Sequence, residues 1–89
     1  MHTIRDKAKL LARVRRIKGQ VAALESQLDQ EEDCGAILQQ AAAVRGAVNG
    51  FMSALIEGHL HDHVVHEPNP GQRQRDLDIV MRAVKPYLK

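Results

Sequence analysis

Apolar residues recur along the first third of the chain at alternating steps of four and three positions. This spacing predicts an α-helix with a narrow apolar stripe, like the seam of a coiled coil. The segment Thr3 to Asp6 has the spacing of an N-terminal capping element, so we expect the first helix to run from about residue 4 to 29. The stripe consists of Leu10, Val14, Ile17, Val21, Leu24 and Leu28.

A second series with the same spacing follows the acidic segment 29–33. Asp33 can cap the helix that comes next, because its side chain can accept a hydrogen bond from the first turn. No proline occurs between Cys34 and His66, so the pattern predicts one long helix that ends at the proline- and glycine-containing segment 67–71. The apolar positions are Ile37, Ala41, Val44, Val48, Phe51 and Leu55.

The remaining apolar pattern predicts a short third helix from about residue 73 to 88. It is carried by Leu77, Val80, Met81, Val84, Tyr87 and Leu88. No segment alternates with the period of a β-strand. We therefore predict an all-α chain of three helices that forms one domain over residues 1–89.

Composition indicates that this domain does not stand alone. The chain has 89 residues with one Phe, one Tyr and no Trp, so little bulky apolar material is available for a core and oligomerisation is expected. No apolar run approaches the roughly 20 residues that span a bilayer. The basic N-terminus lacks the apolar stretch of a signal peptide, and a single Cys forms no internal disulfide, so we expect a cytoplasmic protein.

Histidines gather at the predicted end of the second helix and suggest a metal site. His59 and His63 are four residues apart, so one helix face presents both. Cys34, the chain's thiol, is 25 residues upstream of His59, about 37 Å away along an unbroken helix. A second, antiparallel chain would bring its own Cys34 to this pair, with the two helices crossing near the small residues of segment 46–50.

The thiolate and imidazole donors restrict which metal ions this site can bind. A thiolate with several imidazoles suits zinc, nickel, cobalt or copper among the divalent ions. His2 can add a further ligand, and more than four ligands would favour nickel or cobalt over tetrahedral zinc, whereas a single sulfur is a poor site for Cu(I). His61 and His66 are further candidate ligands that the spacing alone neither includes nor excludes.

The same residues have other interpretations. The histidines can be ordinary solvated surface residues and Cys34 a small apolar one. Cys34 can also be a reactive thiol, although the adjacent Glu31, Glu32 and Asp33 oppose thiolate formation. No third group that would orient a Cys–His pair is recognisable, so we do not expect an enzyme.

Charge is distributed unevenly. Residues 1–18 contain seven basic residues and one acidic residue, whereas the rest of the chain contains six basic and ten acidic residues. A localised basic surface favours a polyanion partner, nucleic acid first. Helix-turn-helix spacing, zinc-finger patterns and aromatic platforms are not visible, so contact with DNA would use another helical surface. The candidate contact residues are Arg13, Arg15, Arg16 and Lys18 on the first helix and Arg45 on the second.

Two stretches resemble a known family over nearly the whole chain. Residues 13–24 (RVRRIKGQVAAL) and 34–50 (CGAILQQAAAVRGAVNG) are similar to the CsoR/RcnR family of bacterial metal-sensing repressors. The resemblance implies an antiparallel four-helix-bundle dimer that assembles into a tetramer. It also implies that the metal-free form binds double-stranded operator DNA and that the effector releases it.

The candidate ligands indicate which branch of this family the chain resembles. Copper sensors have Cys at the position of His63, and formaldehyde sensors pair the Cys with an N-terminal proline and an acidic residue at that position. His2, Cys34, His59 and His63 instead resemble the nickel- and cobalt-responsive branch. The resemblance therefore implies Ni(II) or Co(II) as effector, with Zn(II) as a further candidate, and control of a metal-efflux gene.

Two alternatives remain from the sequence. One is a formaldehyde- or thiol-responsive repressor of the same family that uses Cys34 without metal. The other is a helical bundle held together by a structural metal that does not bind DNA.

Overall fold

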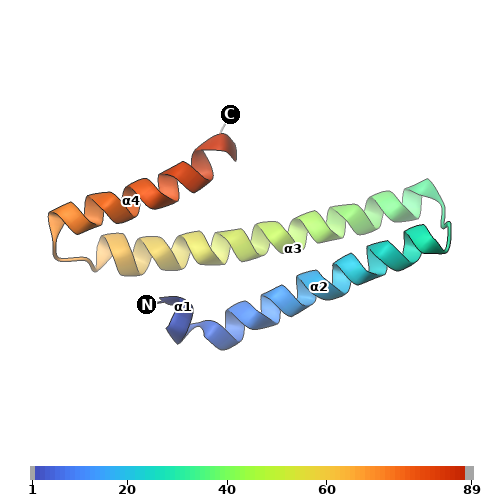
Figure 1. Cartoon of the computed structure of the whole chain (residues 1–89), viewed down its shortest axis with the longest axis horizontal. Coiled ribbons are helices and arrows are strands. Elements are labelled where there is room, and N and C mark those ends of the chain that lie inside the picture. The colour runs from blue at the N-terminus through green and yellow to red at the C-terminus, as the bar shows by residue number, and fades with distance from the viewer. Residues whose placement is uncertain (1, 88–89) are drawn as a thin grey trace.

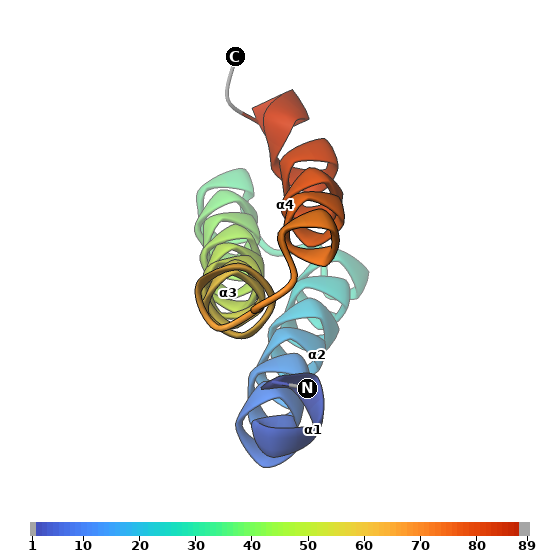
Figure 2. The ribbon, with the colours of Figure 1, turned by 90° about the vertical axis from the view of Figure 1, so that its left-hand side faces the viewer.

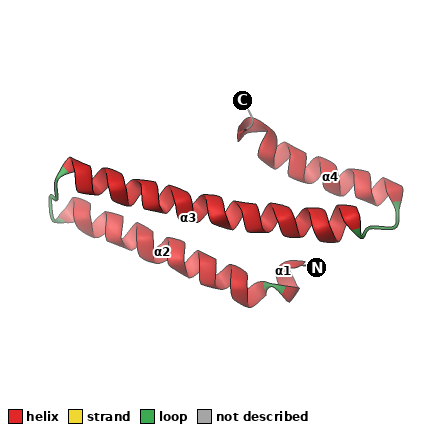
Figure 3. Ribbon diagram, turned by 180° about the vertical axis from the view of Figure 1, so that it is seen from behind, coloured by secondary structure: helices red, strands yellow, loops and turns green. Residues whose placement is uncertain are grey.

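The computed structural model describes residues 2–87, which are helical apart from short connections (Figure 1). Two long helices, α2 and α3, form an antiparallel hairpin, and α4 turns back along the C-terminal half of α3 (Figures 1 and 3). The elements are α1 (His2–Arg5), α2 (Lys7–Asp29), α3 (Cys34–Leu60), the π-helix η1 (His61–Val65), α4 (Pro70–Val84) and the 3₁₀-helix η2 (Lys85–Tyr87). The all-α class is thus confirmed, but four α-helices replace the three predicted.

The first predicted helix is divided, and its predicted start was wrong. Helicity begins at His2 rather than near residue 4, and Asp6 separates α1 from α2. Asp6 has φ −99° and ψ 16°, and its side chain makes no capping hydrogen bond. Its carboxylate instead lies 3.3 Å from a guanidinium nitrogen of Arg5. The Thr3–Asp6 spacing misled because residues 2–5 are already helical and Asp6, at the start of α2, makes no side-chain cap.

The turn between α2 and α3 has the predicted cap. The Asp33 side chain accepts a hydrogen bond from the backbone N–H of Ala36 at 3.2 Å, which satisfies one of the free donors at the start of α3. Glu31, with φ 56°, reverses the chain just before it. Gln40 then donates to the backbone carbonyl of Gln20 at 3.0 Å, tying the two long helices together part-way along.

The second long helix continues past its α-helical part. α3 passes without interruption into the π-turn η1, in which the N–H of His66 bonds the carbonyl of His61, five residues earlier, at 3.2 Å. α4 then begins at Pro70, three residues before the predicted start, because the Asn69 side chain caps the N–H of Gln72 at 2.9 Å and proline suits the first helical position. The predicted end at residue 88 lies outside the described residues.

The helices form a single thin layer without an enclosed core. The Cα positions extend over 55 × 32 × 13 Å, and Figure 2 shows that α2 and α4 both lie against α3 without closing a bundle. Among residues 2–86, for which burial is described, Val80 is the one buried hydrophobic side chain. In this same range no helix has the combined length and apolar character that crossing a membrane requires.

The apolar stripe of α2 is covered on one side only. Leu10, Ile17 and Leu24 are half-buried. The alternate members, Val14, Val21 and Leu28, are 41%, 46% and 57% exposed. Half of a coiled-coil seam therefore packs against α3, and the other half forms an exposed apolar face.

Candidate metal centre

Three histidines from three different elements come together at the C-terminal end of α3. His2 comes from α1, His59 from α3 and His63 from η1, and one ring nitrogen of each lies within 4.8 Å of the others. The ring centroids of His59 and His63 are 4.8 Å apart, and His2 lies 5.8 Å from His63 and 6.3 Å from His59. We refer to these residues as the three-histidine cluster.

His2 is held in the cluster by a close approach to α3. It is 4% exposed, and its ring lies directly over Gly58, where an added Cβ would come within 3.0 Å of the imidazole Cγ. Arg5 fixes the other end of α1 by donating a 3.0 Å hydrogen bond to the carboxylate of Asp62 in η1. The absence of a side chain at residue 58 is thus what allows α1 to dock here.

Burial also sets the protonation state of His2. Loss of solvent lowers the pKa of His2 below the usual imidazole value, and the neighbouring His63, His59 and Arg5 lower it further against the opposing charge of Asp62. At Asp62, desolvation favours the neutral acid, but the hydrogen bond and charge of Arg5 outweigh it and lower the pKa of that carboxyl. His2 is therefore kept neutral, with a ring lone pair available to a metal ion.

Asp76 on α4 orients the other two imidazoles, a role that the sequence did not reveal. Its backbone carbonyl lies 2.7 Å from Nε2 of His59, and a carbonyl only accepts, so Nε2 carries the proton and Nδ1 the lone pair. Its carboxylate lies 3.7 Å from Nδ1 of His63, which favours the opposite tautomer there. Gln72 holds the carboxylate through a 2.8 Å hydrogen bond. Carbonyl and carboxylate oxygens beside the second ring nitrogen commonly fix the rings that bind metals.

The donor set fits a late first-row divalent ion. Metal–imidazole bonds of about 2.0–2.1 Å separate neighbouring ligand atoms by roughly 3 Å, so the three rings need to close by about 1–2 Å to share one ion. A cavity of about 550 Å³ adjoins them, with Met52, Leu55 and Val80 among its apolar walls. The arrangement leaves coordination positions for further ligands beyond the three imidazoles.

The remaining candidate ligands are not part of this cluster in one chain. Cys34 is the first residue of α3, exposed and unpaired, at the end of the helix opposite to His59. The helix between them is continuous, so the predicted separation of about 37 Å within one chain holds. His61 and His66 contact each other instead, with ring centroids 4.4 Å apart.

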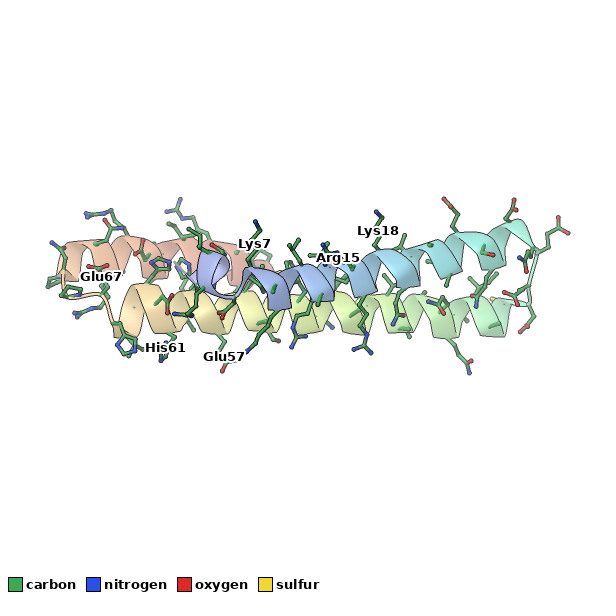
Figure 4. The ribbon with its side chains drawn as sticks, turned by 90° about the horizontal axis from the view of Figure 1, so that it is seen from below. Lys7, Arg15, Lys18, Glu57, His61 and Glu67 are labelled. Carbon is green, nitrogen blue, oxygen red and sulfur yellow. The ribbon has the colours of Figure 1, made fainter. Side chains whose placement is uncertain are left out.

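The predicted DNA-contact residues are exposed along the hairpin. Arg15 and Lys18 extend from α2 on the side away from α3, whereas Glu57 and His61 extend from the α3 side (Figure 4). The Arg13 guanidinium lies close to Gly50 of α3, beside a groove of about 260 Å³ that Arg16 also lines. Arg45 is exposed on α3. Basic side chains are thus accessible on both long helices.

Comparisons with known proteins agree with one another. Residues 6–86 match the family model described as metal-sensitive transcriptional repressor. The chain is 51% identical over 88 residues to the transcriptional repressor RcnR of Salmonella typhimurium, covering 99% of this chain and 98% of the relative. It is 52% identical, with the same coverage, to the transcriptional repressor RcnR of Escherichia coli O9:H4.

One solved structure is similar to this chain over its whole length. It is a variant of the formaldehyde-responsive regulator FrmR from Salmonella enterica serovar Typhimurium. Its TM-score is 0.89 at 49% sequence identity, and the match covers 99% of this chain and 100% of that one.

The contact between His2 and Gly58 predicts a specific effect of Gly58→Ala. The new methyl group would displace the imidazole, so Ni(II) affinity should fall although alanine stabilises a helix by about 1 kcal/mol relative to glycine. Gly19→Ala on α2 is the control, since a Cβ there meets nothing within 4 Å. Competition with a metal-binding dye measures both affinities. Equal affinities in the two variants would show that His2 does not depend on this contact.

The lowered pKa of His2 predicts a pH dependence of α1 docking. Because the folded chain disfavours the charged ring, docking contributes its full stability above the unfolded-state value of about 6.5 and loses it as pH falls through the lower folded pKa. Histidine ring NMR signals followed through an acid titration of the metal-free protein test this. A His2 ring that titrates at or above the value for a free imidazole would contradict it.

Proposed function

This chain belongs to the family of metal-sensitive transcriptional repressors, and from that premise we propose that it binds operator DNA when metal-free and releases it when it binds Ni(II) or Co(II). Release would allow transcription of a metal-efflux gene. The observation that carries the choice of effector is the three-histidine cluster, in which a buried, neutral His2 meets His59 and His63. Zn(II) is a further candidate that the same donors accept.

Cys34 of a second chain completes the metal site in this proposal. The exposed apolar face of α2, made of Val14, Val21 and Leu28, needs a covering layer, which another hairpin of the same kind supplies. Antiparallel packing about segment 46–50 of α3 brings each chain's Cys34 to the other chain's histidines. Thiolate and three imidazoles, with water or the chain's terminal groups, then give the higher coordination number that nickel and cobalt accept more readily than zinc.

Operator binding uses the basic side chains of the hairpin. Arg13, Arg15, Arg16 and Lys18 lie within six positions of α2 and are exposed. Guanidinium groups match phosphate geometry, and each phosphate contact releases counterions, so binding should weaken steeply with salt. Arg45 extends this surface onto α3.

His2 connects the metal site to the DNA surface. α1 is already helical and docked in the structure, so metal binding does not need to order it. In the proposal, ligation by His2 draws α1 toward His59 and His63. α2 follows because only Asp6 separates the two helices, and α2 carries the basic side chains.

A second candidate function is sensing of formaldehyde through Cys34. Two observations favour keeping it: Cys34 is exposed, and the similar solved structure is of a formaldehyde-responsive regulator. The three-histidine cluster has no part in that chemistry. Family membership disfavours the other alternative, a structural-metal bundle without DNA binding.

We expect Ni(II) or Co(II) to lower operator affinity by about 5- to 150-fold, the range of 1–3 kcal/mol coupling energies. The metal-free protein would first select its operator from a pool of random duplexes, and fluorescence anisotropy would then give affinities with and without each ion. His2→Ala should keep metal-free DNA binding and lose most of the metal response. Unchanged affinity with every ion would exclude the metal-sensing proposal.

The same assay separates the formaldehyde alternative. If formaldehyde releases the operator and Ni(II) does not, and if mass spectrometry finds an adduct on Cys34, the second candidate replaces the first. Release by metal in the Cys34-intact protein but not by formaldehyde supports the first.

The shared site predicts that two inactive chains complement each other. In a mixed dimer of a Cys34→Ser chain and a His63→Ala chain, one site retains an intact Cys34 from one chain and intact histidines from the other. Thiolate-to-nickel charge-transfer absorption should therefore appear in the mixture and be absent from either variant alone. If each site lay within one chain, the mixture would show no band, which would refute the shared arrangement.

A further inference from the structure

Two histidines outside the three-histidine cluster face each other on η1. Nε2 of His61 and Nε2 of His66 lie 3.2 Å apart, and their rings are arranged edge to face with centroids 4.4 Å apart. The His61 side chain is 62% exposed, and it extends from the surface opposite α2 (Figure 4). His66 is also exposed.

The π-turn is what brings this pair together. Residues five apart on an α-helix point in directions about 140° apart, because each residue turns by about 100°. In η1 the backbone hydrogen bond joins His66 N–H to the His61 carbonyl, so residues five apart are stacked along one face. The two nitrogen atoms consequently meet at the surface rather than on different sides of the helix.

The separation of the nitrogens matches two ligands on one ion. Two bonds of about 2.0–2.1 Å with their outer atoms 3.2 Å apart enclose an angle of about 100° at the metal, between the values for octahedral and tetrahedral coordination. The Asp62 carboxylate lies 3.6 Å from Nδ1 of His61. A proton is thereby favoured on Nδ1, and Nε2 keeps the lone pair that a metal requires.

We propose that His61 and His66 form a second, solvent-exposed site for a late first-row divalent ion, separate from the three-histidine cluster. Two imidazoles supply the protein ligands, and water fills the remaining positions. The site does not depend on a partner chain or on Cys34, and its existence is independent of the proposed sensing function. With two protein ligands it binds more weakly than a site with four.

Equilibrium dialysis with Ni(II) alone, at mildly alkaline pH where free imidazoles are neutral, tests the proposal on the full-length protein. The wild-type chain should show a tight and a weak class of bound Ni(II). His61→Gln/His66→Gln should lose the weak class and keep the tight one. His61→Gln alone should weaken that class about a hundredfold, because two-point attachment is lost.

The matched control is His59→Gln/His63→Gln, which should lose the tight class and keep the weak one. The wild-type chain could instead show no tight class, while its weak class is still lost in His61→Gln/His66→Gln. That result would contradict the sensing proposal and support the second site. Binding curves that coincide for the wild-type chain and His61→Gln/His66→Gln would overturn the second site. The 3.2 Å contact would then be a hydrogen bond between two imidazoles and nothing more.

Discussion

The shortage of enclosed volume is the constraint on which the rest of this structure depends. The helices lie in one layer and bury a single apolar side chain, Val80, among the described residues. Small domains gain stability from the fraction of surface that they bury, and a layer of this thickness buries little. Half of the α2 stripe packs on α3, and the other half leaves apolar area exposed that adds nothing to the stability of the single chain. Cys34 lies at the opposite end of α3 from the histidines and is exposed there.

Periodicity predicted the long helices well because their apolar positions are regular over many turns. The stripe from Leu10 to Leu28 and the series from Ile37 to Leu55 both fall on continuous helix, and the Asp33 cap forms as predicted. The breaks were missed because each depends on contacts made elsewhere in the chain. Asp6 lies between helices because His2 docks on Gly58, 56 positions later, and no local pattern contains that information.

The candidate site was predictable in its residue types but not in its arrangement. Spacing alone paired His59 with His63. His2 was expected as a further ligand from its donor type and from the family resemblance, but no spacing rule pointed to its docking over Gly58. Nothing in the spacing pointed to Asp76, since its contacts with His59 and His63 arise from the way α4 folds back on α3. Nor does an α-helical wheel pair His61 with His66, because the pairing follows from the wider winding of η1. The contacts of Asp76 and the His61–His66 pair were thus missed because they depend on long-range docking and on a local change of helix type.

Asp6, the single residue between α1 and α2, determines how the two helices can move relative to each other. Asp6 leaves the helix hydrogen-bonding pattern intact on both sides, since its N–H bonds the carbonyl of His2 and its carbonyl accepts from Leu10. The two helices are thus joined by one pair of backbone torsions; α1 contributes His2 to the three-histidine cluster, and α2 carries the arginines. α2 has 23 residues and is therefore about 35 Å long. A rotation of a few degrees at residue 6 displaces its far end by several ångströms. Through such a joint, a closure of the three imidazoles by about 1–2 Å around one ion would displace the far end of α2 by several ångströms.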